Sequence, residues 1–172
     1  MRVVNPFLWA RRGCAAVLLT VGLAGGVAIG TGVASATAPA LVITPKGPFH
    51  NGETIKISAG PNKFFRAFGR VNVLECADPG GKKSNLPKDD TTCDGNTIQG
   101  NTILVKKNGS FAENGYQLFV LPNPTLGELA NGQPVCNKKH PCVLYVGEDQ
   151  SNFNTWPKEF SSPFTISSGK GS

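Results

Sequence analysis

Short runs of apolar residues recur along the chain and are separated by turn-forming residues. The runs lie at residues 41–43, 54–58, 71–74, 102–105, 117–120, 143–146 and 164–166. In the run 54–58, apolar and polar residues alternate, which is typical of a strand with one buried face. Turn signals such as Asn51-Gly52 and Asn108-Gly109 lie between runs. The pattern predicts an all-β domain of six or seven short antiparallel strands, arranged as a two-sheet sandwich or a barrel.

The first 36 residues have the pattern of an export signal. Arg11-Arg12 precede an apolar run from Cys14 to Val33, which ends at Ala34-Ser35-Ala36. The run is long enough to be an uncleaved membrane anchor, but its glycines and the small-residue terminus favour cleavage after Ala36. We therefore expect a signal peptide at 1–36, an exported domain at 37–166 that is secreted or held in the cell envelope, and a flexible tail at 167–172. The membrane is expected as a partner only if the leader is retained.

Composition and charge limit the partners. Charged residues make up only 16% of the chain, and glycine (21) and proline (13) are abundant, which suits a turn-rich β domain. The net charge of +6 includes three leader arginines, so the exported part carries 14 basic and 11 acidic residues. A net charge of +3 predicts that the protein contacts DNA at most weakly. We also expect a monomer. The phosphate-contact candidates in such an interaction are Arg66, Arg70, Lys82 and Lys83.

Four cysteines remain after the leader: Cys76, Cys93, Cys136 and Cys142. Export places them in an oxidising space, where four cysteines allow three disulfide connectivities. Pairing in chain order is predicted because each sequential pair brackets a polar, turn-forming segment. The alternative is a zinc site that includes His140, but neither pair has the usual close spacing of zinc ligands. Structural disulfides are therefore expected, and no metal.

Residues for catalysis are scarce. Only His50 and His140 could act as histidine bases, and both are expected in exposed turns. The chain contains neither a G-x-S-x-G nor an H-E-x-x-H sequence. The acidic segment 89–95 has the composition of a calcium loop without its alternating ligand spacing. We therefore expect a protein that is not an enzyme and has no resident cofactor.

Several segments, taken in order, resemble the neocarzinostatin family of secreted apoproteins that carry enediyne chromophores. The matching residues are Val42-Ile43-Thr44-Pro45, Asn51-Gly52, Ile55-Lys56-Ile57-Ser58, Val73-Leu74-Glu75-Cys76-Ala77, Cys93, Asn108-Gly109-Ser110, the Cys136/Cys142 pair, Val143-Leu144-Tyr145-Val146-Gly147 and Phe164-Thr165-Ile166. The resemblance covers about residues 40–167. It implies a seven-stranded immunoglobulin-like antiparallel sandwich with a small two-stranded ribbon and two disulfides.

The resemblance also implies a ligand cleft beside the ribbon, floored by Cys76 and Cys93. The aromatic position two residues after the first cysteine is Asp78 here, and the one after the second cysteine aligns with Ile98. Leu126, with Leu129 nearby, aligns with the aromatic before the small disulfide, and Gly147 replaces a serine. Each lost stacking partner removes about 0.5–1.5 kcal/mol beyond area burial, so a planar aromatic ligand is expected to bind less tightly here.

Two functions follow from these observations. The first is a chromophore carrier with an antibiotic or defence role, in which DNA is the target of the carried ligand. The second is a cell-envelope interaction module that kept the fold and lost the ligand. Exposed aromatics would support this second function: Phe64, Phe65 and Phe68 beside Arg66 and Arg70, and Phe153, Trp156 and Phe160 before the last strand. The alternative interpretation is that these aromatics cap the ends of the core.

Overall fold

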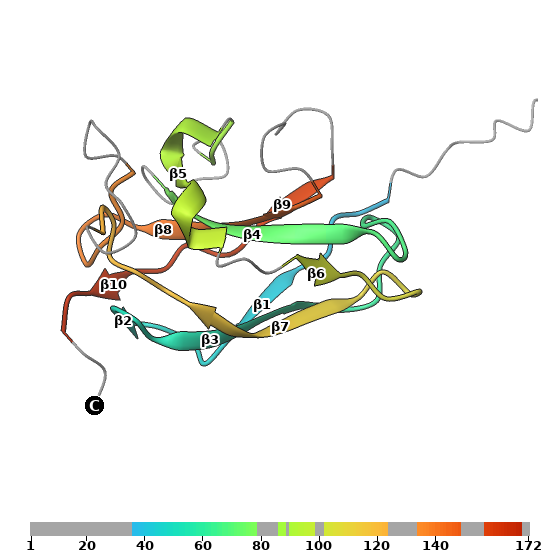
Figure 1. The fold of residues 1–172 in the computed structure, drawn as a ribbon, viewed down its shortest axis with the longest axis horizontal. Helices are drawn as coiled ribbons and strands as arrows, with labels where there is room; N and C mark the ends of the chain where they lie inside the picture. Colours follow the sequence, from blue (N-terminus) through green and yellow to red (C-terminus); the bar gives the residue numbers. More distant parts are fainter. Residues whose placement is uncertain are drawn as a thin grey trace, which may run out of the picture. The chain divides into compact units, whose positions relative to one another are not determined.

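The computed structural model describes residues 36–78, 86–88, 90–98, 102–123, 134–148 and 157–169, all within the compact unit Ala34–Ser172. This part of the chain contains ten strands and two short 3-10 helices (Figure 1). They are β1 (Leu41–Thr44), β2 (Phe49–His50), β3 (Thr54–Ala59), β4 (Arg70–Ala77), η2 (Asp90–Thr92), β5 (Cys93–Asp94), η3 (Gly95–Ile98), β6 (Ile103–Leu104), β7 (Phe111–Gln117), β8 (Cys142–Gly147), β9 (Lys158–Phe160) and β10 (Ile166–Ser167). The prediction of an all-β fold is confirmed.

The strands form three sheets. One has the order β1-β3-β7, and a larger one has the order β5-β4-β8-β9, with β6 also paired to β4. These two sheets are antiparallel throughout and lie one above the other in Figure 1. The third sheet is the pair β2 and β10, which is parallel, so the expectation of antiparallel strands is wrong there. Ser167 pairs with His50 in this sheet and does not begin a flexible tail.

The strand expected at residues 117–120 is misplaced, since β7 spans Phe111–Gln117. Phe111 and Tyr116 are both buried. They are an odd number of residues apart, so a regular strand would place them on opposite faces. A register shift reconciles them, because Tyr116 lies opposite Ile55 and Glu113 lies opposite Ile57. Between these two pairs β7 advances by three residues while β3 advances by two, as in a β-bulge. The extra residue breaks the apolar alternation that would have revealed the strand.

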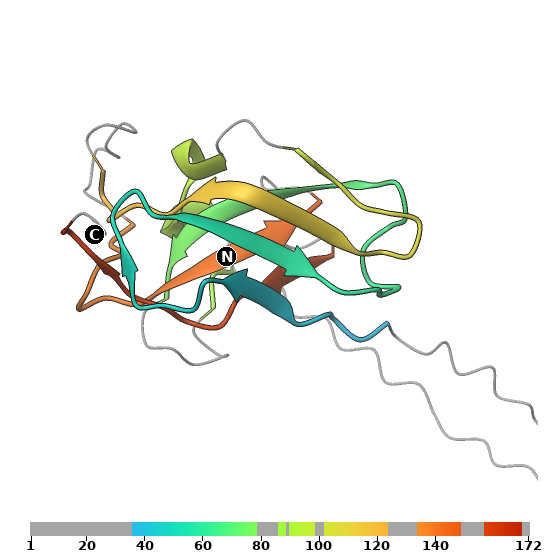
Figure 2. The ribbon, with the colours of Figure 1, turned by 90° about the horizontal axis from the view of Figure 1, so that it is seen from below.

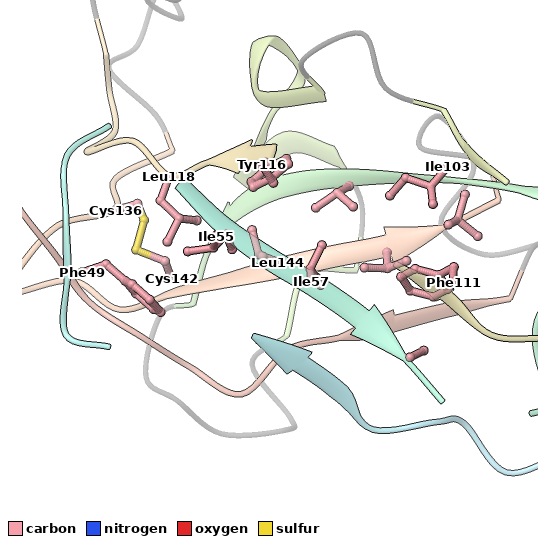
Figure 3. Close-up of a cluster of buried hydrophobic side chains, with 14 of the residues drawn as sticks. Phe49, Ile55, Ile57, Ile103, Phe111, Tyr116, Leu118, Cys136, Cys142 and Leu144 are labelled. Atoms are coloured by element: carbon pink, nitrogen blue, oxygen red, sulfur yellow. A yellow bond between two sulfur atoms is a disulfide. The ribbon is translucent and has the colours of Figure 1, made fainter. Parts of the chain in front are cut away.

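The main hydrophobic core lies between the two larger sheets (Figure 3). Ile55 and Ile57 of β3 face Leu144 of β8, and Phe111 and Tyr116 close the same layer. The disulfide Cys136–Cys142 lies in this core with both cysteines fully buried. Phe65 packs edge-on against Phe111, with ring centroids 5.6 Å apart.

The larger sheet is buried on its other face as well. Every residue of β8 is buried, a pattern typical of a strand covered on both sides. Leu74, Cys76, Cys93, Val143 and Tyr145 form a second apolar cluster, and Leu86 and Phe160 pack against it. We call these seven residues the outer cluster. Leu74, Cys76, Val143 and Tyr145 lie on the face of β4 and β8 that points away from the main core, and the other three pack against this face.

Both disulfides join the cysteines in chain order, Cys76 with Cys93 and Cys136 with Cys142, so the predicted connectivity is confirmed. The predicted leader lies outside the described residues, apart from Ala36. In the part of the chain that the structure describes, no helix is long and apolar enough to cross a membrane.

Candidate functional site

The predicted ligand residues can be followed only in part. Cys76 lies on β4 and Cys93 on β5, where they form a cross-strand pair as well as a disulfide. Gly147 ends β8, opposite Asn72 at the other end of β4. Leu126 and Leu129 lie outside the described residues, as does the side chain of Ile98. The described part of the predicted site is therefore a strip along the outer face of β4 and β8.

Asp78, which the resemblance predicts as a cleft-lining residue, is buried just beyond the end of β4. It follows β4 and is only 1% exposed. Its backbone N–H donates a 2.9 Å hydrogen bond to the Pro141 carbonyl. This bond attaches the end of β4 to the residue before Cys142, so Asp78 connects the neighbourhoods of the two disulfides.

Tyr145 occupies the middle of this strip and was not predicted as a site residue. Residues 143, 145 and 147 alternate with the inward-facing ones, so they share the outer face of β8. The Tyr145 ring lies over Gly147, because a Cβ added at Gly147 would overlap the Tyr145 hydroxyl. Phe160 of β9 contacts the ring edge-on, at a centroid distance of 5.7 Å. The described floor is therefore aromatic, although the predicted aligned positions are not.

The floor disulfide is not open to solvent. Cys76 is fully buried, Cys93 is 4% exposed and Tyr145 is fully buried. A ligand at this site would therefore contact the aromatic layer of the outer cluster and displace part of its cover. The sequence does contain a signal for this layer: the uninterrupted apolar run of β8 indicates burial on both faces.

A buried polar cluster attaches the β5–η3 segment to β4. The Thr97 hydroxyl accepts a 2.8 Å hydrogen bond from the Glu75 N–H and donates a 2.6 Å bond to the Asp94 carbonyl. Glu75 is fully buried on the inner face of β4, where its Oε2 accepts a 3.1 Å bond from the Phe119 N–H. Glu75 and Asp94 are also cross-strand neighbours. These contacts hold the segment that carries Cys93 in place.

Glu75 is held in an environment that favours its neutral form. Burial raises its pKa well above the usual value, the Phe119 N–H opposes this shift, and the Asp94 carboxylate adds to it. Its Oε1 lies 3.2 Å from the Cys136 sulfur. Because a disulfide sulfur carries no proton, that contact does not stabilise a charged carboxylate. Burial and the nearby carboxylates of Glu75 and Asp94 also raise the pKa of Tyr116.

The raised pKa of Glu75 predicts a pH dependence of stability. The folded state binds the proton more tightly than the unfolded state, so this contribution is complete below the unfolded pKa of about 4.3 and is lost as pH rises toward the folded pKa. We expect Glu75→Gln to be more stable than the wild type by about 1–3 kcal/mol at pH 8, with the difference shrinking toward pH 4. Urea denaturation across this pH range measures it. A difference that does not change with pH would contradict the prediction.

Glu75, Cys136 and Cys142 place three potential metal-binding atoms within 4.8 Å of one another. Both sulfurs belong to the disulfide, so neither is available as a thiolate. His140 is exposed in the loop between the same cysteines. The geometry therefore describes a disulfide beside a carboxyl group, and not the zinc site considered from the sequence.

His50 is not in an exposed turn, contrary to expectation. It ends β2 and is partly buried, and its Nδ1 lies 2.8 Å from the Ser167 hydroxyl oxygen. The same hydroxyl donates a 3.2 Å bond to the Phe49 carbonyl. These bonds join β2 to β10, which gives the histidine a structural role in the parallel pair.

One open cavity of about 510 Å³ lies between the β1–β2 connection and the segment before β10, and a second of about 500 Å³ lies along β1; Gly47, Pro163 and Phe164 line both. Neither includes Cys76, Cys93 or Gly147 among its lining residues. They are distinct from the outer cluster.

Comparisons with protein-family profiles, with curated proteins and with solved structures found no match.

Proposed function

We propose that this chain is an exported, non-enzymatic carrier of a small apolar molecule, held against the outer face of β4 and β8. The observation that carries the proposal is the outer cluster. It makes the larger sheet apolar on both faces, and only the inner face packs against another sheet of the described structure. An apolar sheet face with aromatic side chains and a disulfide at its base has the chemistry of a small-molecule site.

The arrangement of the strands supports the finer fold that the resemblance implies. The orders β1-β3-β7 and β5-β4-β8-β9, facing each other across one core, fit an immunoglobulin-like sandwich. In this assignment β5 and η3 belong to the ribbon beside the cleft. Figure 2 shows the three-stranded sheet from its outer side, with β8 behind it.

In this proposal DNA is a target of the carried ligand.

An equilibrium titration tests the carrier function. The chain from Thr37 to Ser172 contains both disulfides, all residues of both clusters and a single tryptophan, Trp156. We expect an enediyne chromophore or 1-anilinonaphthalene-8-sulfonate to change the Trp156 fluorescence in a saturable way, with a Kd below about 1 mM. No saturable binding of any apolar probe below that concentration would contradict the proposal.

The position of the site is tested by Phe160→Ala, which removes the edge contact with Tyr145. We expect this variant to raise the Kd about tenfold, in line with the loss of one aromatic contact. The control is Val42→Ala, because Val42 is 51% exposed on β1 and is not part of the outer cluster. Equal Kd values for the two variants would place the ligand elsewhere.

A further inference from the structure

Two loops at one end of the domain are joined into a single surface. The β3–β4 loop and the β6–β7 turn lie side by side in both ribbon views (Figures 1 and 2). Asn62 donates from its backbone N–H to the Asn108 carbonyl at 2.9 Å and from its amide nitrogen to the Gly109 carbonyl at 2.7 Å. Further along, the Phe68 N–H donates to the Val105 carbonyl at 3.0 Å. These bonds fix the positions of the side chains that both loops present.

The two loops carry a strong excess of positive charge. Residues 60–70 and 102–110 contain five basic residues and no acidic residue: Lys63, Arg66, Arg70, Lys106 and Lys107. All five are exposed. The exported chain has 14 basic and 11 acidic residues, so outside these loops acidic residues outnumber basic ones by eleven to nine. The small net charge therefore conceals a local excess of positive charge in these two loops.

Two apolar side chains lie among these cations. Phe68 is 67% exposed and Leu104 is 59% exposed, and Leu104 lies directly opposite Arg70 in the β4–β6 register. We call the five cations with Phe68 and Leu104 the basic end. At this exposure the two side chains contribute little to the core, and together with the cations they form one surface that is both basic and apolar.

Phe68 has an unusual backbone conformation as well. Its φ is +61°, in the left-handed region that glycine adopts without cost and an aromatic residue adopts at about 1–2 kcal/mol. The flanking bonds from Phe68 N–H to Val105 and from Gly69 N–H to Arg66 hold this conformation. A glycine at position 68 would satisfy the same backbone, so neither packing nor the turn accounts for a phenyl group there. Strain of this kind often marks a functional position.

Glu148 orients one of the cations. Its Oε1 accepts a 2.9 Å bond from the Arg66 N–H, and its Oε2 lies 3.9 Å from the Arg66 Nε. The Glu148 side chain is 5% exposed, whereas that of Arg66 is 71% exposed. The carboxylate is thus turned inward and fixes the loop backbone, and the guanidinium stays available at the surface.

We propose that the basic end docks the domain on an anionic lipid surface, with Phe68 and Leu104 entering the headgroup region and the five cations contacting lipid phosphates. Basic side chains around exposed phenylalanine and leucine are the composition of interfacial membrane-binding surfaces. Single-stranded nucleic acid would use the same charges, but it stacks on aromatic faces and gains little from Leu104. The proposal is independent of the ligand site on the outer cluster.

Vesicle flotation tests this proposal, with the chain from Thr37 to Ser172 and vesicles of phosphatidylglycerol and phosphatidylcholine in equal parts at about 0.1 M salt. We expect binding to these vesicles and none to pure phosphatidylcholine. The double variant Lys106→Ser/Lys107→Ser is expected to lower the partition coefficient about thirtyfold. The matched control is Lys138→Ser/Lys139→Ser, an adjacent exposed pair in the small disulfide loop with the same loss of charge. This control is expected to change the partition coefficient less than about threefold.

Phe68→Gly tests the apolar contribution without risk to the fold. We expect it to be at least as stable as the wild type, because it relieves the left-handed strain, and to lower partitioning about tenfold. Equal losses for the two lysine pairs would show a response to net charge alone and would overturn the proposal. So would wild-type partitioning of Phe68→Gly, or tighter binding of a single-stranded DNA oligonucleotide than of the anionic vesicles at the same salt concentration.

Discussion

Replacing Cys76 and Cys93 together by alanine is expected to lower the free energy of unfolding by about 3 kcal/mol. The disulfide closes a loop with a sequence separation of 17 residues, and opening it returns conformational entropy to the unfolded chain. The fold itself should persist, because Thr97 still attaches the β5–η3 segment to β4 through Glu75 and Asp94. The expected result is thus a less stable domain with the same strands.

Guanidinium denaturation without reductant, followed by Trp156 fluorescence and circular dichroism, measures this loss. The control is the same double variant after addition of a reductant, which reports the Cys136–Cys142 disulfide separately. A loss below about 1 kcal/mol for the double variant would contradict the prediction and show that the segment around Cys93 is already restrained in the unfolded chain. The same variant should bind an apolar probe less tightly if the outer cluster is the ligand site.

The sequence predicts most of the strands for a simple reason. The runs that became β1, β3, β4 and β8 combine β-branched residues with clear turn signals at both ends, so local preference and burial agree. The failures have local causes. The β-bulge removed the alternation of β7, and the two-residue strands β2 and β5 are too short to produce a pattern. The parallel pairing of β2 and β10 joins residues that are 117 positions apart, which no local pattern can reveal.

The candidate site was less predictable than the fold. The order of the cysteines predicted both disulfides, but the aligned ligand positions did not identify Tyr145 as the residue that covers the strip. That role depends on which face of β8 each residue occupies and on the absence of a side chain at Gly147. Of the basic end, the sequence singled out Arg66, Arg70 and Phe68, but it did not bring Lys63, Lys106, Lys107 or Leu104 together with them. Net charge sums over the chain, whereas the structure places five cations of two distant loops beside one another.

The aromatic floor of the outer cluster depends on a single glycine. At Gly147 an added Cβ would overlap the hydroxyl and the ring of Tyr145, which is fully buried. We expect Gly147→Ala to lower the free energy of unfolding by about 2–3 kcal/mol, as overpacking of a filled interior does. Urea denaturation measures the loss. The control is Gly95→Ala in η3, where a Cβ meets nothing within 4 Å and the change should stay within about 0.5 kcal/mol.

A second substitution separates the proposed clash from other causes of instability. Shortening the ring by Tyr145→Leu in the Gly147→Ala background is expected to recover at least about 1 kcal/mol, although the same substitution alone removes the contact with Phe160 and destabilises. Opposite effects in the two backgrounds would locate the interaction between residues 145 and 147. Additive losses would contradict the proposed clash and would show that the Tyr145 ring can move off residue 147. In that case the floor of the ligand site would be the disulfide itself, as the resemblance implies, and Phe160→Ala would no longer be expected to weaken binding.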